Sequence, residues 1–455
     1  MQRTLWIVAW SLALGALNPG VPLAAAQANH PGRPQEAPRD TLTLTLSEAH
    51  RRALALNPEH LADRQQIDIA NGQLTQARTY AFNPELEVQA PGVGAGGALR
   101  EYELSFIQEI EWAGQRGLRV RAARSGADLA AAAVHNSARQ ILADVSYAFY
   151  GTLAAEQRLG VARELVQLNE ELVTITRIQA REGEISVMDA NLAEIEAGRA
   201  RAAVLAAERE QTTARLQLQR LLGLGPEQPL RIRDDVPAAP SPSNLNPDSL
   251  VAFALARRPD LAAGTRALEQ AETLVRLARR EAIPNVRLSL FVERDGANRT
   301  APDISGAPSL GSRLESPRVG LGVSLALPIF QRNQGLIDER AAQGEQARLA
   351  REASELTVRT EVVNAYQAYR AASEETRVFE QDVLEPARAN QRLLETALRA
   401  GKVGLPTLLL LRNQLLDAEL SYWDAWLEQR WALVDLSVAT ATMSTDLNNN
   451  PLEAR

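Results

Sequence analysis

The chain carries one pattern of segments twice, about 200 residues apart, and this duplication limits the folds available to it. The first repeat begins with SEAHRRALALNPEHL and the second with DSLVAFALARRPDLA. Pro58 and Pro259 occupy the same place in the two repeats, as do Ala77 and Ala278. Further on, REGEISVMD in the first repeat corresponds to RAGKVGLPT in the second. Each repeat therefore predicts a broken helix, strands, a very long helix, a glycine turn and a return helix.

The first helix of each repeat is interrupted by its proline. Thr45 and Glu48 have the spacing of a capping box in front of the first helix. The residue before Pro58 is disfavoured in helical geometry, so we expect a break there. After the breaks, the helices are expected to continue to Phe82 in the first repeat and to Ile283 in the second.

Two longer stretches, residues 115–182 and 331–385, contain no proline. At a rise of 1.5 Å per residue, the first would form a helix about 100 Å long. Only partner helices can cover so much surface, so we expect coiled-coil packing. Coiled-coil steps of three and four separate Leu165, Leu168, Leu172 and Ile175. Return helices are expected over 187–222 and 406–443.

Alternating apolar and polar residues predict four strand segments, at 85–90, 101–106, 286–293 and 318–327. In the last segment, valine and leucine alternate with Arg318, Gly320, Gly322 and Ser324. Such a period of two predicts strands with one apolar face and one polar or small face.

Four strands from one chain cannot close a barrel by themselves. An open sheet in lipid would leave backbone groups unpaired, at a cost of several kcal/mol for each. The strands therefore either close with other copies of the chain or lie inside a water-soluble sandwich. We favour the shared barrel, because helices about 100 Å long on an exported chain need something to bridge.

The N-terminus has the features of a secretion signal. Arg3 supplies the positive charge, an apolar stretch follows, and Ala24–Ala26 offers a cleavage site. A membrane-anchoring helix is the alternative, but Asn18–Gly20 ends the apolar run too early for a span. No later stretch reaches the roughly 20 apolar residues that a transmembrane helix needs.

The expected domain organisation follows from these segments. It comprises a signal peptide at 1–26, a spacer at 27–40, a first repeat at 41–235, a linker at 236–245, a second repeat at 246–443 and a disordered tail at 444–455. The chain has no cysteine. Disulfides, thiolate metal sites, a cysteine nucleophile and a lipidated cysteine are therefore excluded.

Composition and motifs argue against catalysis and nucleic-acid binding. The net charge of −7 is the wrong sign for a nucleic-acid surface. The four histidines are scattered, at His30, His50, His60 and His135. No nucleophile motif or phosphate-binding loop is present, so we expect no enzyme, no cofactor and no resident metal site.

The order of these motifs resembles the TolC-type outer-membrane efflux protein family over essentially the whole mature chain. LSEAHRRALALNPEHL, the alternating strands, LPIFQRNQGLIDER, REGEISVMD and the closing leucine-rich helix carry the resemblance. More narrowly, QEIEWAGQRGLRV and PIFQRNQG resemble the cobalt–zinc–cadmium (CzcC-like) branch of the family.

The resemblance implies a homotrimer in the outer membrane of a Gram-negative bacterium. Three chains of four strands would form one 12-stranded transmembrane β-barrel, below which paired helices would form a coiled-coil barrel across the periplasm. The implied fold class is α+β, mainly α, and internally duplicated. A periplasmic membrane-fusion adaptor and an inner-membrane pump of the resistance–nodulation–division (RND) class would be the partners. The barrel lumen would be lined by Arg287, Ser289, Arg318 and Ser324.

The turns after the long helices are the candidate gate at the periplasmic entrance. They contain Glu184 and Asp189 in the first repeat, and Lys402 and Thr407 in the second. In a trimer, Asp189 would form a ring of carboxylates, which attracts cations and repels anions. The alternative is that these residues simply cap solvated helices.

The same turns are candidates for adaptor docking, because small and aliphatic residues allow helix tips to pack closely. The residues concerned are Gly183, Ile185, Val187, Gly401, Val403 and Leu405. Closure of the helical hairpin is the alternative role. Trp112 and Phe330, at the two strand-to-helix junctions, either lie at lipid headgroups or pack the junction.

The sequence thus predicts a passive outer-membrane exit duct of a tripartite RND-type efflux system. Resemblance favours divalent heavy-metal cations as substrate, with multidrug or organic compound efflux as the alternative. A type I protein secretion duct would have the same fold. A structural periplasmic coiled coil, the alternative of another class, would need no strands with an apolar face.

Overall fold

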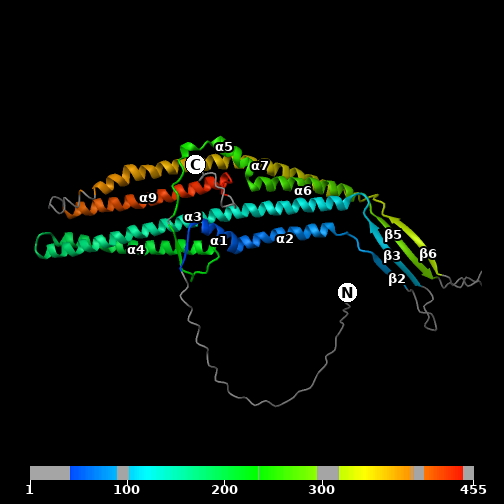
Figure 1. Ribbon diagram of the computed structural model, residues 1–455, viewed down its shortest axis with the longest axis horizontal. Helices are drawn as coiled ribbons and strands as arrows, with labels where there is room; N and C mark the ends of the chain where they lie inside the picture. Colours follow the sequence, from blue (N-terminus) through cyan, green and yellow to red (C-terminus); the bar gives the residue numbers. More distant parts are fainter. Residues whose placement is uncertain are drawn as a thin grey trace, which may run out of the picture. The chain divides into compact units, whose positions relative to one another are not determined.

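A computed structural model describes residues 41–89, 102–233, 235–294, 317–390, 393 and 404–443. The expected signal peptide, spacer and tail lie outside these residues. The described residues belong to one packed unit, in which long helices run side by side and a sheet lies at one end of them (Figure 1).

The two repeats contain the same elements in the same order. The first comprises α1 (Leu46–Leu56), α2 (Pro58–Arg78), β2 (Glu85–Gln89), β3 (Tyr102–Ile110), α3 (Gln115–Arg181) and α4 (Val187–Leu221). The second comprises α5 (Pro247–Arg257), α6 (Pro259–Glu281), β5 (Val286–Arg294), β6 (Arg318–Leu325), α7 (Gln334–Val378), a π-helix (Phe379–Leu384) and α9 (Leu405–Ala439). The mainly helical, duplicated fold predicted from the sequence is confirmed.

Three short elements escaped the sequence analysis. The strands β1 (Leu42–Leu44) and β4 (Leu230–Ile232) form a parallel pair, and a 3-10 turn (Pro242–Asn244) lies in the expected linker. Strands of three residues are too short to show an alternating pattern, so periodicity could not reveal them.

The helix breaks arise as predicted. Thr45 accepts from the backbone N–H of Glu48, and the Glu48 carboxylate accepts from the Thr45 N–H at 2.8 Å, which completes the capping box. Asn57 is extended, with ψ 121°, and Pro58 begins α2. The prediction that this helix reaches Phe82 is wrong by four residues, because Thr79 is already extended, with ψ 144°.

The four longer strands form one antiparallel sheet in the order β2-β3-β5-β6. Adjacent hairpins supply the outer pairs, and β3 pairs with β5 to join the two repeats. The pairing aligns apolar residues across the sheet: Leu86 lies opposite Phe106, Phe106 opposite Leu290, and Leu290 opposite Leu321.

The 67-residue helix α3 is the axis of the packed helices. It contacts α2 and α6 on the side of the sheet, and α4 and α9 further along, while α7 contacts α6 and α9 (Figure 1). The main apolar clusters lie midway, where these helices meet. One includes Phe149, Leu218 and Leu427, and the other includes Val362 and Tyr369.

The coiled-coil seam near the end of α3 differs in part from the predicted one. Leu172 is buried as expected, whereas Ile175 is 53% exposed. Thr176 is buried in its place, and its hydroxyl donates to the Leu172 carbonyl at 2.9 Å. The spacing of apolar residues therefore predicted Ile175 in the seam. The structure has Thr176 there instead, one position further along, and its hydroxyl is hydrogen-bonded within the helix.

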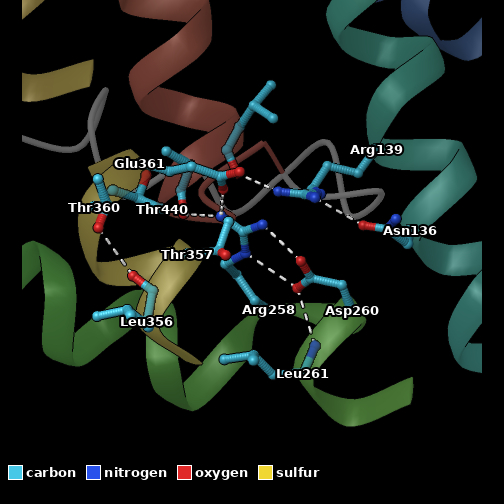
Figure 2. A network of polar contacts seen from close by, with 12 residues as sticks. Asn136, Arg139, Arg258, Asp260, Leu261, Leu356, Thr357, Thr360, Glu361 and Thr440 are labelled. Carbon is cyan, nitrogen blue, oxygen red and sulfur yellow. Dashed lines mark hydrogen bonds and ion pairs between the residues drawn. The ribbon is translucent and has the colours of Figure 1, made fainter. Parts of the chain in front are cut away.

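A buried arginine joins the ends of three helices in the second repeat (Figure 2). Arg258 lies between α5 and α6, and its side chain is only 5% exposed. Its guanidinium donates to Asp260 at 2.6 Å, to Glu361 on α7 at 2.5 Å, and to the carbonyl of Ala439 at the end of α9 at 3.3 Å. Both charges that face it are therefore of opposite sign, which is what burial of a guanidinium requires.

Arg139 on α3 extends this network into the first repeat. It donates to the carbonyl of Val438 and to the Asn136 side chain (Figure 2). Burial alone would raise the pKa of Asp260, but the hydrogen bonds and positive charge of Arg258 outweigh burial and lower it. Asp260 therefore stays ionised and supports the arginine.

The residue before each proline caps the return helix of its own repeat. Asn57 donates from its side chain to Leu221 O at 2.8 Å, and Arg258 reaches Ala439 O in the second repeat. Each return helix then ends with a left-handed residue, Gly223 with φ 65° and Ala441 with φ 54°. Only the first repeat has glycine there, although an L-residue pays about 1–2 kcal/mol in this conformation.

This difference between the repeats predicts opposite effects of two substitutions on the free energy of unfolding. A Cβ on Gly223 would lie 2.5 Å from the backbone oxygen of Leu56, so Gly223→Ala should lower the free energy of unfolding by about 1–3 kcal/mol. Ala441→Gly should raise it or leave it unchanged, because relief of strain offsets the greater chain entropy. Urea unfolding followed by far-UV circular dichroism measures both. A loss of stability in Ala441→Gly as large as that in Gly223→Ala would contradict this account.

His50 on α1 is buried against Ser146 on α3. The Ser146 hydroxyl donates to the Leu142 carbonyl at 2.8 Å, so it must accept from Nε2 of His50, which lies 2.7 Å away. Burial lowers the pKa of His50 to about 4, despite a smaller raising effect of the Leu142 backbone. His50 is therefore neutral in the folded protein at neutral pH.

The lowered pKa predicts acid sensitivity. In the unfolded chain His50 protonates near its ordinary value of 6.5, whereas the folded protein resists protonation until about 4. The contribution of neutral His50 to the free energy of unfolding is therefore fully present above pH 6.5. It is lost as the pH falls from 6.5 to about 4, by about 3 kcal/mol in total. Unfolding midpoints of wild type and His50→Gln should therefore converge as pH falls from 7 to 4. A constant difference between the two would refute the assignment.

Candidate functional site

One face of the sheet carries every charged residue of its four described strands except Arg294. Cross-strand pairing places on this face Glu85, Glu87, Glu103, Glu109, Arg287, Ser289, Glu293, Arg318 and Ser324. Glu109 lies opposite Arg287, with 3.6 Å between their charged atoms, and also accepts from Asn285 at 2.8 Å. All four residues predicted for the lumen share this face. Five carboxylates outnumber two guanidiniums on this face, an imbalance that was not predicted from the sequence.

An aromatic ring on the polar face explains one of its glycines. Phe291 lies opposite Gly320, and a Cβ on that glycine would come 2.3 Å from the ring. Gly322 similarly leaves room for the Ser289 hydroxyl, which would lie 2.4 Å from a Cβ. The alternating glycines of β6 were the signal that large neighbours lie across from them.

The opposite face of the sheet is apolar and open. Leu321 is 84% exposed, and Val319 and Val323 are similarly uncovered. Along β5, Leu288 and Leu290 continue the same face. A surface of this kind marks contact with lipid or protein, since a chain in water would bury it.

The first helix tip is a tight turn that the sequence placed correctly. Gly183 is left-handed, with φ 78°, and the N–H of Glu184 donates to Gln179 O at 2.9 Å to close α3. Ser186 then caps α4: its hydroxyl accepts from the Asp189 N–H at 3.1 Å and donates to the Asp189 carboxylate at 2.8 Å. Ser186 is therefore the cap, and the Asp189 carboxylate supports it through the Ser186 hydroxyl at an exposed position.

Apolar side chains project from this tip. Val187 is 68% exposed and Met188 is 76% exposed, whereas Ile185 is half-buried. Met188 was not among the predicted docking residues. The apolar pair at the start of an otherwise polar first turn would have identified it.

Only part of the second tip is described. Gly401, Lys402 and Val403 lie outside the described residues, and Leu405 is the first residue of α9. Thr407 is exposed on the first turn of this helix. Asp189 and Thr407 therefore occupy matching positions in the first turns of α4 and α9.

A small apolar cluster brings the two repeats together near their tips. Leu408 and Leu409 of α9 are buried against Leu172 of α3, and Leu192 of α4 packs against them. Asp189 and Thr407 accordingly belong to the same end of the helices, opposite the sheet (Figure 1).

The two junction aromatics differ from each other. Trp112 donates from its indole N–H to Pro284 O at 3.0 Å, so it packs the junction between the repeats while remaining 62% exposed. Phe330 is 91% exposed. The junction-packing alternative thus describes Trp112, and Phe330 stays available for a partner or lipid.

Within the described ranges, neither a metal-binding cluster nor a membrane-spanning helix is present. No three His, Asp or Glu side chains there are placed to hold a metal ion together. No helix among the described residues has the length and apolar character to cross a membrane.

Comparison with known proteins agrees with this geometry. The family described as outer membrane efflux protein matches residues 49–224 and 250–442. The cobalt-zinc-cadmium resistance protein CzcC of Cupriavidus metallidurans is 25% identical over 383 residues, 83% of this chain and 85% of the relative. The pyoverdine export outer membrane protein OpmQ of Pseudomonas putida is 31% identical over 167 residues, 36% of this chain and 33% of the relative.

A solved structure shows the same fold. The open state of the Neisseria gonorrhoeae MtrE outer membrane channel superposes with a TM-score of 0.66 at 21% identity, covering 87% of this chain and 88% of that one. The family match spans both repeats and most of the chain. The chain therefore belongs to the outer membrane efflux protein family, the non-enzymatic TolC-type channels of the Gram-negative outer membrane.

Proposed function

We propose that this efflux channel is the exit duct for divalent metal cations in a tripartite RND-type system. TolC-type channels are trimers in tripartite efflux systems. In three protomers, the sheets close into one barrel, with the apolar face towards lipid and the charged face towards water. The observation that carries the cation assignment is the charge of that second face.

Each protomer contributes five carboxylates and two guanidiniums to this face. Arg287 is paired with Glu109 and Arg318 lies opposite Glu293, which leaves the surplus negative charge with Glu85, Glu87 and Glu103. A water-filled pore lined by surplus carboxylates concentrates cations and repels anions. The similarity to CzcC, a cobalt-zinc-cadmium resistance protein, supports metal cations as the exported ions.

The helix tips supply the other half of the duct. Glu184 and Asp189, with Lys402 and Thr407 of the second repeat, form the periplasmic entrance in this proposal, and the Asp189 carboxylates make its negative ring. A periplasmic membrane-fusion adaptor docks on the aliphatic tip residues, the predicted set together with Met188. The inner-membrane pump supplies the energy, since this chain has no nucleotide-binding motif.

Export of an organic compound is the second candidate. The partial similarity to OpmQ, a pyoverdine export protein, favours it. That similarity covers about a third of the chain, whereas the similarity to CzcC extends over most of it. The metal assignment is therefore preferred.

Ion selectivity in planar bilayers tests the lumen. The wild-type channel should be cation-selective, and the triple variant Glu85→Gln, Glu87→Gln, Glu103→Gln should shift its reversal potential towards zero. Arg318→Gln is the matched control on the same face, and it should shift the potential the opposite way. Both shifts should shrink in high salt, because screening shortens the range of the charges. An anion-selective wild type, or shifts of equal sign, would refute the cation lumen.

Metal tolerance tests the substrate. Expressed with its cognate pump and adaptor in a host lacking metal efflux, the channel should restore growth on cobalt, zinc or cadmium. The isosteric variant Asp189→Asn should weaken this tolerance and the block of the bilayer channel by trivalent cations. Ser186→Ala, which removes the cap but keeps the carboxylate, is its control. Restored tolerance to organic compounds alone would favour the second candidate.

A further inference from the structure

Four connections join the sheet to the helices, and each of them carries an exposed arginine (Figure 1). Arg78 ends α2 before β2, and Arg116 lies in the first turn of α3 after β3. Arg279 and Arg280 lie in the last turn of α6 before β5, and Arg332 precedes α7 after β6. In a chain whose net charge is −7, these five side chains are a local surplus of positive charge.

The carboxylates at this level do not neutralise the arginines. Glu111 is the one acidic residue within the four connections, and Arg119 on α3 already pairs with it. Glu281, at the end of α6, is exposed. None of the five guanidiniums pairs with a carboxylate in the described part of the chain. Arg116 instead donates to the carbonyl oxygen of Arg78 at 2.6 Å, which sets it beside the end of α2. Positive charges gathered without counter-ions favour an anionic partner.

The duplication repeats one of these arginines. Arg78 and Arg279 directly follow the two alanines that match between the repeats, and both side chains are exposed. Two positions further on the repeats diverge, since Tyr80 corresponds to Glu281. An arginine kept at matching places beside a changed residue indicates a role that both connections share.

Aromatic residues indicate the level of the connections in the membrane. Tyr102 begins β3, and Trp112 follows its end ten residues later. Ten residues span about 34 Å along a strand, and a barrel tilt of 35–45° reduces this to a height of about 24–28 Å. The apolar band of an outer-membrane barrel is about 25 Å tall. Trp112 therefore lies at its boundary on the side of the helices, and the hydroxyl of Tyr80 reaches the same level by donating to Glu109 O at 3.0 Å.

The arginines are within reach of the lipid headgroups at this boundary. The headgroup layer adds roughly 5–7 Å beyond the hydrocarbon on each side of a bilayer. One helical turn rises 5.4 Å, so the first turn of α3, with Arg116, falls within that layer. An arginine can also lay its methylene stem along apolar surface while its guanidinium donates two hydrogen bonds to a phosphate.

We propose that these five residues, the junction arginines, bind the phosphate groups of anionic phospholipids in the periplasmic leaflet of the outer membrane. The proposal rests on the lipid-facing barrel proposed above. The junction arginines hold the barrel at a fixed depth, with its apolar face in hydrocarbon and its helices in water. They also favour anionic over zwitterionic lipid around this end of the barrel.

Trp112 provides a reporter beside the site, because it shares a connection with Arg116. The channel is reconstituted in phosphatidylcholine, and quenching of its fluorescence by brominated phosphatidylglycerol is compared with quenching by brominated phosphatidylcholine. The anionic lipid should quench Trp112 with a several-fold preference, which shrinks in high salt. Trp112→Phe gives the background signal of the other tryptophans, which is subtracted.

Two pairs of substitutions test the arginines themselves. Arg78→Gln with Arg279→Gln should lower the preference by about fivefold, because positive charge near the headgroups is lost. Arg78→Lys with Arg279→Lys keeps the charge and should keep most of the preference. The matched control, Arg181→Gln with Arg209→Gln, removes the same charge from exposed positions at the end of α3 and on α4. It should leave the preference unchanged.

The outcomes separate this site from the duct. Equal quenching by the two lipids in the wild type would overturn the site, as would a preference that survives in Arg78→Gln with Arg279→Gln. A shift in ion selectivity of that variant, with its lipid preference intact, would also overturn the site and assign the arginines to the interior of the duct. A conducting channel without lipid preference leaves the duct standing. A Trp112 that neither brominated lipid quenches would contradict the lipid-facing barrel itself.

Discussion

The rest of this fold depends on one constraint, which is that the surface of α3 must be covered by other helices along its length. A single helix of 67 residues has no stability of its own in water and depends on neighbours along its whole length. The duplication supplies them, with α2 and α6 along one half of α3 and α4 and α9 along the other. The same logic applies to the sheet, whose apolar face and two open edges remain uncovered in one protomer. In the proposed trimer, the membrane and the neighbouring protomers would cover them.

Much of the fold could be read from the sequence because its signals are long or local. Proline breaks, the Thr45 capping box, the strand alternation and the glycine turn at Gly183 each act within a few residues. The parts that were missed depend on distant partners. Thr176 replaces Ile175 in the coiled-coil seam because its hydroxyl bonds to the preceding turn, and β1 and β4 need each other to exist as strands.

The face of the sheet that carries the predicted lumen residues could be assigned from the sequence, but its charge balance could not. The predicted lumen residues share one face, yet the carboxylate surplus became visible only when pairing placed Glu103 and Glu109 beside them. Sequence alternation assigns residues to a face within a strand, whereas the balance of a face requires the register between strands. At the helix tips, Met188 shows the same limit, since exposure depends on how Ser186 starts the next helix.

In the proposed trimer, the unequal starts of α4 and α9 would give the entrance threefold symmetry, although it has six helical hairpins. Asp189 lies in the first turn of one return helix and Thr407 in the first turn of the other, so in the proposed trimer three carboxylates would alternate with three hydroxyls. The negative potential of these carboxylates would therefore have three lobes. A partner with six identical binding segments would meet two kinds of helix tip in turn. Those segments would have to bind in two different ways.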